Sequence, residues 1–226
     1  MSSTEGTTEP EAESPAVDDL RDGVLAELSA RLGAGLVESH VEPGVDVWLR
    51  VARESWVDAA RVCKDAGFDY FCFLSAVDWL PSPYGKGDED PDAEPRARDT
   101  TIEQGVAGGE TRFQLLARLE SPTRRMGVTL KCDLPDGDLS APTWSGVFPG
   151  ADWHECETWE MFGITFPGHQ GLRHMYLPGD FEGHPLRKDF PLIARMVKPW
   201  PGLVDVEPMP GEEPGEGDEE PAEDAG

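Results

Sequence analysis

The sequence has 226 residues, of which 38% are hydrophobic, 25 are glycine and 21 are proline, a composition lean for a fully folded globular protein. Its formal net charge of −26 excludes typical nucleic-acid-binding proteins and proteins that bind anionic membranes, because both need a cationic surface. The most apolar run, Tyr70–Val77, is far shorter than a transmembrane helix, and the acidic N-terminus lacks the features of a signal peptide. We therefore expect a cytosolic chain with no membrane span.

Acidic residues without any opposing bases are concentrated at the two ends of the chain, in residues 1–17 and 203–226. These segments also have too few large apolar side chains to offset the entropy that ordering would cost. We expect both to be disordered tails that keep the protein soluble, with an electrostatic regulatory role as the alternative.

Residues 18–139 alternate between helical and strand patterns and are expected to form the folded domain. Asp18 and Asp19 are suited to cap a first helix over residues 20–32, which Gly33 would end. The apolar stripe of this helix would consist of Leu20, Val24, Leu28 and Leu32.

Two strands are expected next, at residues 36–41 and 45–51, joined as a hairpin through Pro43-Gly44. The second strand alternates Val and Leu with polar residues, among them Asp46 and Arg50, which is the pattern of a half-buried strand.

A second helix is expected to begin after a Ser55 cap and to run through Ala66. Its inward face would consist of Trp56, Ala59, Ala60 and Cys63. The run at 68–77 that follows is the most continuously apolar in the chain, which predicts a central strand.

Residues 81–110 are rich in proline, glycine and acids, and we interpret them as an acidic insertion on a hairpin. Alternating patterns at 113–119 and 126–132 then predict two antiparallel strands that turn at Ser121-Pro122-Thr123. The expected fold class is therefore α+β, a mixed sheet with helices on one face.

Residues 140–202 have a different character, because they combine turns and large apolar side chains without a clear period. A helix is expected over Ala151–Gly163, capped near Asp152 and closed by Gly163. The irregular stretch after it cannot bury its aromatic side chains within its own secondary structure and needs a surface to lie on. The fold class thus includes an extended C-terminal arm that docks on a partner.

Residues 140–202 allow three interpretations of a functional site. A metal site has suitable ligand types but no zinc-finger or H-E-x-x-H spacing, and its ligands would be His154, Cys156, His169, His174 and His184. Glu157 and Glu160 share a helix face and could act as a general acid and base, although such a face is usually solvated or ion-paired.

The third possibility is a docking arm with aromatic anchors and a charged rim. Its anchors would be Trp159, Phe162, Tyr176, Phe181, Phe190 and Trp200. Its rim charges would be Arg173, Arg187, Lys188, Arg195 and Lys198. Because the cysteines form no C-x-x-C pair and no glycine-rich nucleotide-binding motif is present, no cluster or nucleotide is expected on this chain.

The segment Glu155–Tyr176 resembles the signature of the thirty-kilodalton family, the C-type subunits of the proton-translocating NADH–quinone oxidoreductase, respiratory complex I. The matching positions are Glu155, Glu157, Glu160, Met161, Phe162, His169, Arg173, Met175 and Tyr176. The block Gly183–Asp189 resembles the continuation of the family. One position departs, because Cys156 stands where the signature has Arg, which removes a cation between Glu155 and Glu157.

The resemblance implies a non-catalytic structural and assembly subunit of the hydrophilic arm, with no catalytic, cofactor-binding or metal-binding residues of its own. The complex would transfer electrons from NADH through FMN and iron–sulfur clusters to quinone and translocate protons. The alternative is the equivalent subunit of a related membrane-bound hydrogenase or other donor-linked complex.

The implied partners are the quinone-site (D-type) subunit and the terminal-cluster (B-type) subunit, on the cytoplasmic face of the bacterial cell membrane, to which the chain would be peripheral. The expected partner interface consists of Glu155, Glu157, Glu160, Phe162, His169, Arg173, His184, Arg187, Lys188 and Asp189.

Overall fold

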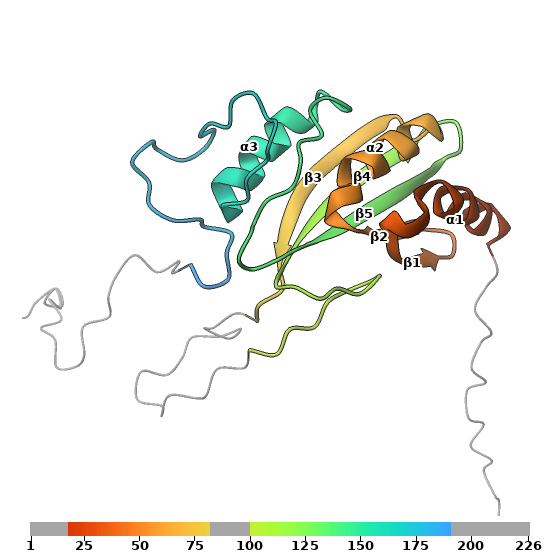
Figure 1. Cartoon of the computed structure of the whole chain (residues 1–226), viewed down its shortest axis with the longest axis horizontal. Helices are drawn as coiled ribbons and strands as arrows, with labels where there is room; N and C mark the ends of the chain where they lie inside the picture. The colour runs from red at the N-terminus through yellow and green to blue at the C-terminus, as the bar shows by residue number, and fades with distance from the viewer. Residues whose placement is uncertain (1–17, 82–99, 191–226) are drawn as a thin grey trace, which may run out of the picture. The chain divides into compact units, whose positions relative to one another are not determined.

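The computed structural model describes residues 18–81 and 100–190, which contain a five-stranded sheet and three α-helices (Figure 1). The helices are α1 (Asp19–Leu32), α2 (Trp56–Asp65) and α3 (Ala151–Phe162). The strands are β1 (Leu36–Glu42), β2 (Asp46–Val51), β3 (Tyr70–Asp78), β4 (Phe113–Ser121) and β5 (Met126–Leu134). Both expected tails, residues 82–99 of the insertion and residues 191–202 of the arm lie outside the described residues.

The strands follow the order β1-β2-β5-β4-β3, and the sheet is mixed because β2 and β5 run parallel while the other neighbours are antiparallel. The expected hairpins β1–β2 and β4–β5 are both present. The α+β fold class with a mixed sheet is thus confirmed.

The prediction that the apolar run at 68–77 forms the central strand is wrong. β5 is the central strand and is buried at all but one of its positions, whereas β3 lies at the edge of the sheet with Tyr70 59% exposed. The run is apolar because α3 packs along β3, where His154 lies within hydrogen-bonding distance (3.2 Å) of the main-chain oxygen of Leu74 (Figure 1).

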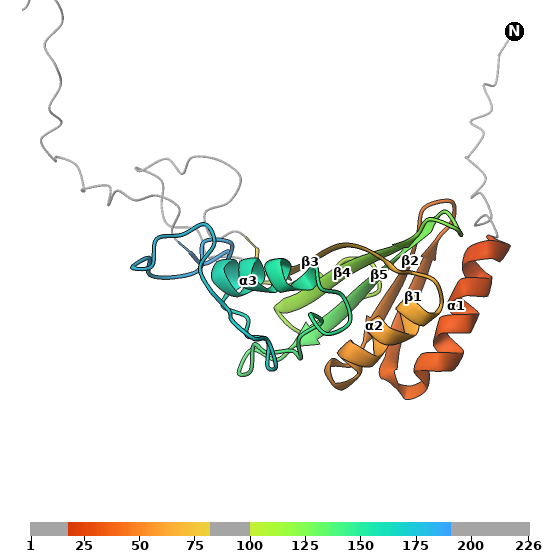
Figure 2. The ribbon, with the colours of Figure 1, turned by 90° about the horizontal axis from the view of Figure 1, so that it is seen from above.

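The hydrophobic core lies between the sheet and the helices, and α1 and α2 lie next to each other on the same side of the sheet (Figure 2). The expected inward face of α2 is confirmed, because all four of its residues are buried. Trp56 also stacks on Trp144, with 4.4 Å between the ring centroids, which joins α2 to the loop before α3. In α1, Val24 and Leu28 are buried, but Leu20 is 72% exposed and does not belong to the stripe.

The second face of the sheet carries a buried polar layer, which corrects the expectation of a half-buried β2. Asp46 accepts hydrogen bonds from Arg118 and Thr129, and Arg50 forms ion pairs of 2.7 Å with Glu38 and Asp133. The alternation of apolar and polar residues along β2 cannot reveal this arrangement. Polar side chains at alternate positions of a strand are read as solvent-exposed unless their partners on other strands are known.

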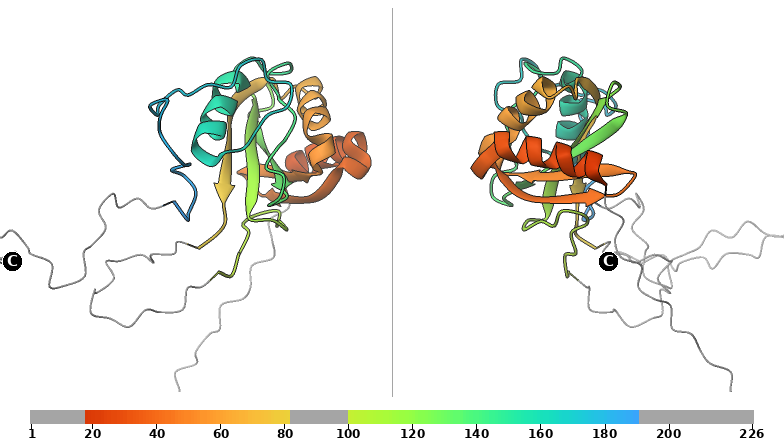
Figure 3. Two further views of the ribbon diagram at one scale, coloured as in Figure 1. Left: turned by 60° about the vertical axis from the view of Figure 1, so that its left-hand side comes forward. Right: turned by 90° about the vertical axis from the view of Figure 1, so that its right-hand side faces the viewer.

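Residues 100–112 lie where β3 ends and β4 begins (Figure 3). Lys131 of β5 is only 1% exposed and donates hydrogen bonds to the main-chain oxygens of Val106 (2.7 Å) and Gly108 (2.9 Å). Ala107 between them is buried. The described part of the insertion is therefore tied to the sheet.

Two expected helix caps are absent. Ser55 is the last residue of a short 3-10 turn, Arg53–Ser55, and makes no side-chain capping hydrogen bond to α2. Helix α3 begins after Gly150, again without a side-chain cap. The carboxylate of Asp152 contacts His169 and Arg173 instead. The cap at Asp18 is present, because its carboxylate accepts from the N–H of Arg21.

Candidate functional site

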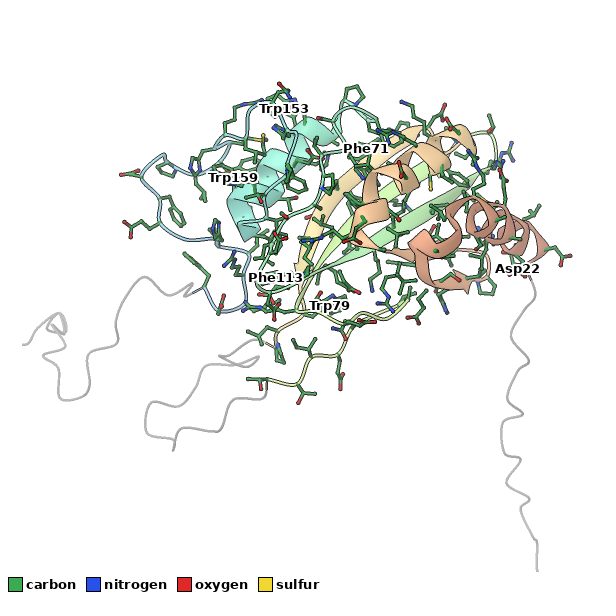
Figure 4. The ribbon with its side chains drawn as sticks, viewed as in Figure 1. Asp22, Phe71, Trp79, Phe113, Trp153 and Trp159 are labelled. Atoms are coloured by element: carbon green, nitrogen blue, oxygen red, sulfur yellow. The ribbon has the colours of Figure 1, made fainter. Side chains whose placement is uncertain are left out.

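The expected site residues lie on α3 and on residues 163–190, which are the described part of the arm. The described arm has no helix or strand of its own, and its only sheet-like pairing is an isolated bridge between Thr165 and Ser140. It is held to the rest of the chain by polar groups from α3, β3 and the residue before β4. Figure 4 shows Trp153 and Trp159 on α3, beside the arm.

Glu160 is the main anchor of the arm. Its carboxylate is 0% exposed and accepts hydrogen bonds from three consecutive N–H groups, those of Met175 (3.1 Å), Tyr176 (3.1 Å) and Leu177 (2.8 Å). The ring of His174 lies 3.1 Å away. Burial acts to raise the pKa of Glu160, but these hydrogen bonds outweigh it and lower the pKa. Because the carboxylate is fully engaged as an acceptor, its geometry suits a structural role.

The arm also caps the C-terminus of α3. Helix ends leave main-chain oxygens without partners, and here three successive ones are satisfied by the arm. The Nδ1 atom of His184 lies 2.9 Å from the oxygen of Glu160, the N–H of Leu186 donates to that of Met161, and Arg187 donates to that of Phe162 at 2.6 Å. Cations near a helix C-terminus also interact favourably with the helix dipole.

Gly163 allows this cap to form. It has φ +74°, and a Cβ atom there would lie 2.5 Å from side-chain atoms of both His184 and Arg187. The expected end of the helix at Gly163 is confirmed, and the glycine is needed for close approach as well as for its left-handed conformation.

The far end of the arm is tied to the sheet. Asp78, at the end of β3, accepts from the N–H of Lys188 (2.8 Å) and pairs with Arg112, which also pairs with Asp189. Burial opposes ionisation of Asp78, but the bonds from Arg112 and the Lys188 and Leu80 N–H groups lower its pKa.

A second buried carboxylate, that of Glu155, faces the loop before α3. It accepts hydrogen bonds from the hydroxyl of Thr143 and the N–H of Trp144, and burial raises its pKa. Glu155 therefore does not need the Arg that the family signature has at position 156. Its carboxylate keeps hydrogen-bond donors although Cys156 stands at that position.

Of the five expected metal-ligand candidates, the structure brings together only Cys156 and His169, and Asp152 joins them. Sequence reasoning missed Asp152, although its spacing of four from Cys156 on one helix face was a usable signal. The other three histidines have separate surroundings. His154 packs edge-on against Phe71, while His174 and His184 contact Glu160.

The ten expected interface residues differ widely in exposure. Glu155, Glu160, Phe162 and the side chain of His169 are buried, while Glu157, His184 and Arg187 are half-buried and Arg173, Lys188 and Asp189 are exposed. Their role at an interface stays a prediction. Large exposed apolar side chains lie beside them at Trp153 (58%), Tyr176 (61%), Phe181 (36%) and Leu186 (50%). Trp153 and Leu186 were missed, and the helical period of α3, which buries Ala151, Glu155 and Thr158, could have identified Trp153.

The model of the respiratory-chain NADH dehydrogenase 30 kDa subunit family matches residues 49–196, which includes the end of β2, the strands β3–β5, α3 and the whole described arm. The chain belongs to this family. The family resemblance expected from residues 155–176 is thus confirmed. Within the described ranges, no helix is both long enough and apolar enough to cross a membrane.

Two curated relatives of the chain, both C/D subunits, share clear sequence similarity with it. The C/D subunit of the NADH-quinone oxidoreductase of Pseudomonas fluorescens is 42% identical over 165 residues, 73% of this chain, and that of Cronobacter sakazakii is 35% identical over 185 residues, 81% of this chain. In both, the chain spans only 27% of the length of the relative.

A solved structure shares the fold of this 30 kDa family member. A chain from an archaeal respiratory membrane complex, the membrane-bound sulfane sulfur reductase, matches with a TM-score of 0.59 and 20% identity, over 85% of this chain and 98% of that one. A trypsin-resistant fragment of Nqo5 matches with a TM-score of 0.49 and 22% identity, over 68% of this chain and 99% of the fragment.

Proposed function

We propose that this chain is a non-catalytic structural subunit of the hydrophilic arm of an NADH–quinone oxidoreductase, peripheral to the cytoplasmic face of a bacterial membrane. The observation that carries the proposal is the similarity to C/D-subunit relatives, one of them 42% identical, together with the family match, which includes the whole described arm. In this proposal, FMN, iron–sulfur clusters, NADH and quinone are bound by other subunits, which transfer electrons and translocate protons.

The proposed main partner is a D-type, quinone-site subunit, with a B-type, terminal-cluster subunit beside it. The relatives are C/D subunits by name, and this chain corresponds to only 27% of their length. A segment that is fused to another in a relative is a natural partner of that segment when the two are separate chains. The D part of the relatives therefore supports a D-type partner.

The proposed interface is the exposed apolar surface of Trp153, Tyr176, Phe181 and Leu186. Burial of a fully exposed Leu or Phe side chain gains about 1.5–3 kcal/mol. These side chains, which are 36–61% exposed, would gain part of that free energy when a partner covers them. The backbone at Tyr176 is already held by Glu160, and the backbone at Leu186 is held by the cap of α3. A preorganised arm binds with less loss of conformational entropy than a free segment.

Native purification through a tag on this chain tests the proposal. We expect the quinone-site, terminal-cluster and NADH-oxidising subunits to copurify. Recovery with a different electron-donor module would favour the related donor-linked complexes. Recovery of the folded chain without any partner under gentle detergent conditions would contradict the proposal.

A matched pair of variants tests the interface. Tyr176→Ala combined with Leu186→Asp should abolish copurification while the circular dichroism of the isolated chain stays unchanged, because both side chains are exposed. Leu20→Asp, at a residue that is also exposed but lies on α1, should assemble normally. Arg187→Glu is a poorer choice, because Arg187 caps α3 within the chain.

A further inference from the structure

Asp152, Cys156 and His169 form a compact cluster between α3 and the beginning of the arm. Asp152 and Cys156 are four residues apart on one face of the helix, and the turn at Gly168 brings His169 over them. The Nε2 atom of His169 lies 3.1 Å from an Asp152 carboxylate oxygen and 3.9 Å from the sulfur of Cys156. One ligand atom from each residue lies within 4.8 Å of the others.

We propose that this cluster binds a thiophilic divalent cation of the Zn²⁺ type. A thiolate, an imidazole and a carboxylate are a ligand set that Zn²⁺ takes in proteins, at bond lengths of about 2.0–2.3 Å. Tetrahedral bonds of that length separate the ligand atoms by roughly 3.3–3.8 Å. The cluster reaches this geometry when each side chain moves by less than about 1 Å.

The surroundings of the cluster suit a cation. The side chain of His169 and the whole of Cys156 are 0% exposed, and the carboxylate of Glu155 lies 4.0 Å from the imidazole. Two carboxylates thus lie close to the imidazole, and a divalent cation bound there would interact favourably with both. Asp152 offers Oδ1 to the cluster, while its Oδ2 lies 3.7 Å from the guanidinium of Arg173. Asp152, whose side chain is 35% exposed, offers an entry path and room for water as a fourth ligand.

Proton movements on binding follow from the hydrogen bonds of His169. Its Nδ1 atom accepts from the N–H of Gly171 (3.0 Å), so Nε2 carries the proton and donates to Asp152. Coordination through Nε2 moves this proton to Nδ1, and the thiol of Cys156 loses its own proton to solvent. The Gly171 N–H must then turn away, and a glycine that is exposed, with no heavy atom within 4 Å of its Cβ position, has room to do so.

The bound ion would join the first two turns of α3 to the start of the arm. It would therefore act as a structural clamp, complementary to the cap at the other end of the helix. Only side chains of this chain take part, so the site does not depend on the proposed partners.

Cobalt absorption spectroscopy on the purified, reduced full chain tests the site. Addition of Co²⁺ should give a sulfur-to-metal charge-transfer band with a stoichiometry of one, which Zn²⁺ should abolish by competition. Carboxylates elsewhere in this acidic chain cannot produce that band. Hydrogen exchange should become faster at the Gly171 amide when Zn²⁺ is present.

Three variants complete the experiment. Cys156→Arg restores the signature residue, and it should fold but lose the band, with Zn²⁺ affinity more than about tenfold weaker. His169→Gln should weaken Zn²⁺ binding by a similar factor. Cys72→Ser, at a half-exposed thiol on β3, should keep the band. A wild-type chain without the band, or an equal band in Cys156→Arg, would overturn the proposal.

Discussion

The guanidinium of Arg187 donates a hydrogen bond of 2.6 Å to the main-chain oxygen of Phe162, the last residue of α3. The two residues are 25 positions apart, so this contact closes a long loop onto the helix that precedes it. The loop would otherwise have few reasons to adopt one conformation, because it lacks secondary structure. Its order depends on the burial of Ile164 and Phe166 in the core and on a few polar contacts, and the polar contacts can be removed one at a time.

Gly163→Ala should destabilise the protein by about 1–3 kcal/mol, because the residue needs a positive φ and its Cβ would lie against His184 and Arg187. The loss should appear in chemical denaturation and as faster hydrogen exchange at residues 184–187. Gly23→Ala is the matched control, since Gly23 is exposed within α1 with no heavy atom near its Cβ position. That control should stabilise the protein by roughly 0.5–1 kcal/mol. Equal effects of the two substitutions would contradict the role of Gly163.

Glu160→Gln should lower the free energy of unfolding by about 1–3 kcal/mol, because an amide cannot accept from all the donors that surround the carboxylate. Amide exchange at residues 175–177 should become faster in this variant. Glu157→Gln, at the half-buried acid one turn earlier, should change stability by less than about 0.5 kcal/mol. Unchanged protection of residues 175–177 in Glu160→Gln would show that the arm has another anchor.

Asp18 should make folding sensitive to acid. The N–H of Gly44 together with the side chain and N–H of Arg21 lower its pKa from 3.8 to about 2. A carboxyl whose pKa is lower in the folded state contributes stability above its unfolded value, and this contribution disappears as the pH falls toward 2. Asp18→Asn keeps a capping oxygen but cannot titrate. The difference in urea midpoint between wild type and variant should therefore shrink from about pH 4 to pH 2, and a constant difference would rule out this origin.

Lys131→Met should release residues 104–110 from the sheet, because it removes both hydrogen bonds to the oxygens of Val106 and Gly108. Burial lowers the pKa of Lys131, so at neutral pH the ammonium depends on these acceptors for its solvation. Limited proteolysis should cut residues 104–110 in the variant and spare them in the wild type. Arg61→Met, at an exposed ion pair on α2, serves as the control. Resistance of the Lys131 variant would show that burial of Ala107 and the hydrogen bond from Gln114 to the oxygen of Gly108 hold the segment without Lys131.

Much of the local structure could be predicted from the sequence, because its causes are local. The inward face of α2, the β4–β5 hairpin and the glycine that ends α3 depend on periods of 3.6 and two and on the conformational freedom of glycine. The expected cap at Ser55 failed because a short 3-10 turn precedes α2, and the expected cap at Asp152 failed because its carboxylate contacts His169. A local sequence pattern does not show whether a polar side chain will cap its helix or contact a residue elsewhere in the fold.

The α+β class, the approximate positions of the helices and strands, and the family could all be inferred from the amino-acid sequence, because a motif of fixed spacing and a regular period are properties of the linear chain. The central position of β5, the burial of Asp46 and Arg50, and the role of Glu160 in holding the arm appear only in the folded structure. These features depend on which donors and acceptors meet across long stretches of chain, such as the 110 positions between Asp78 and Lys188. Each buried polar group needs a partner, and the position of that partner is a property of the folded chain alone.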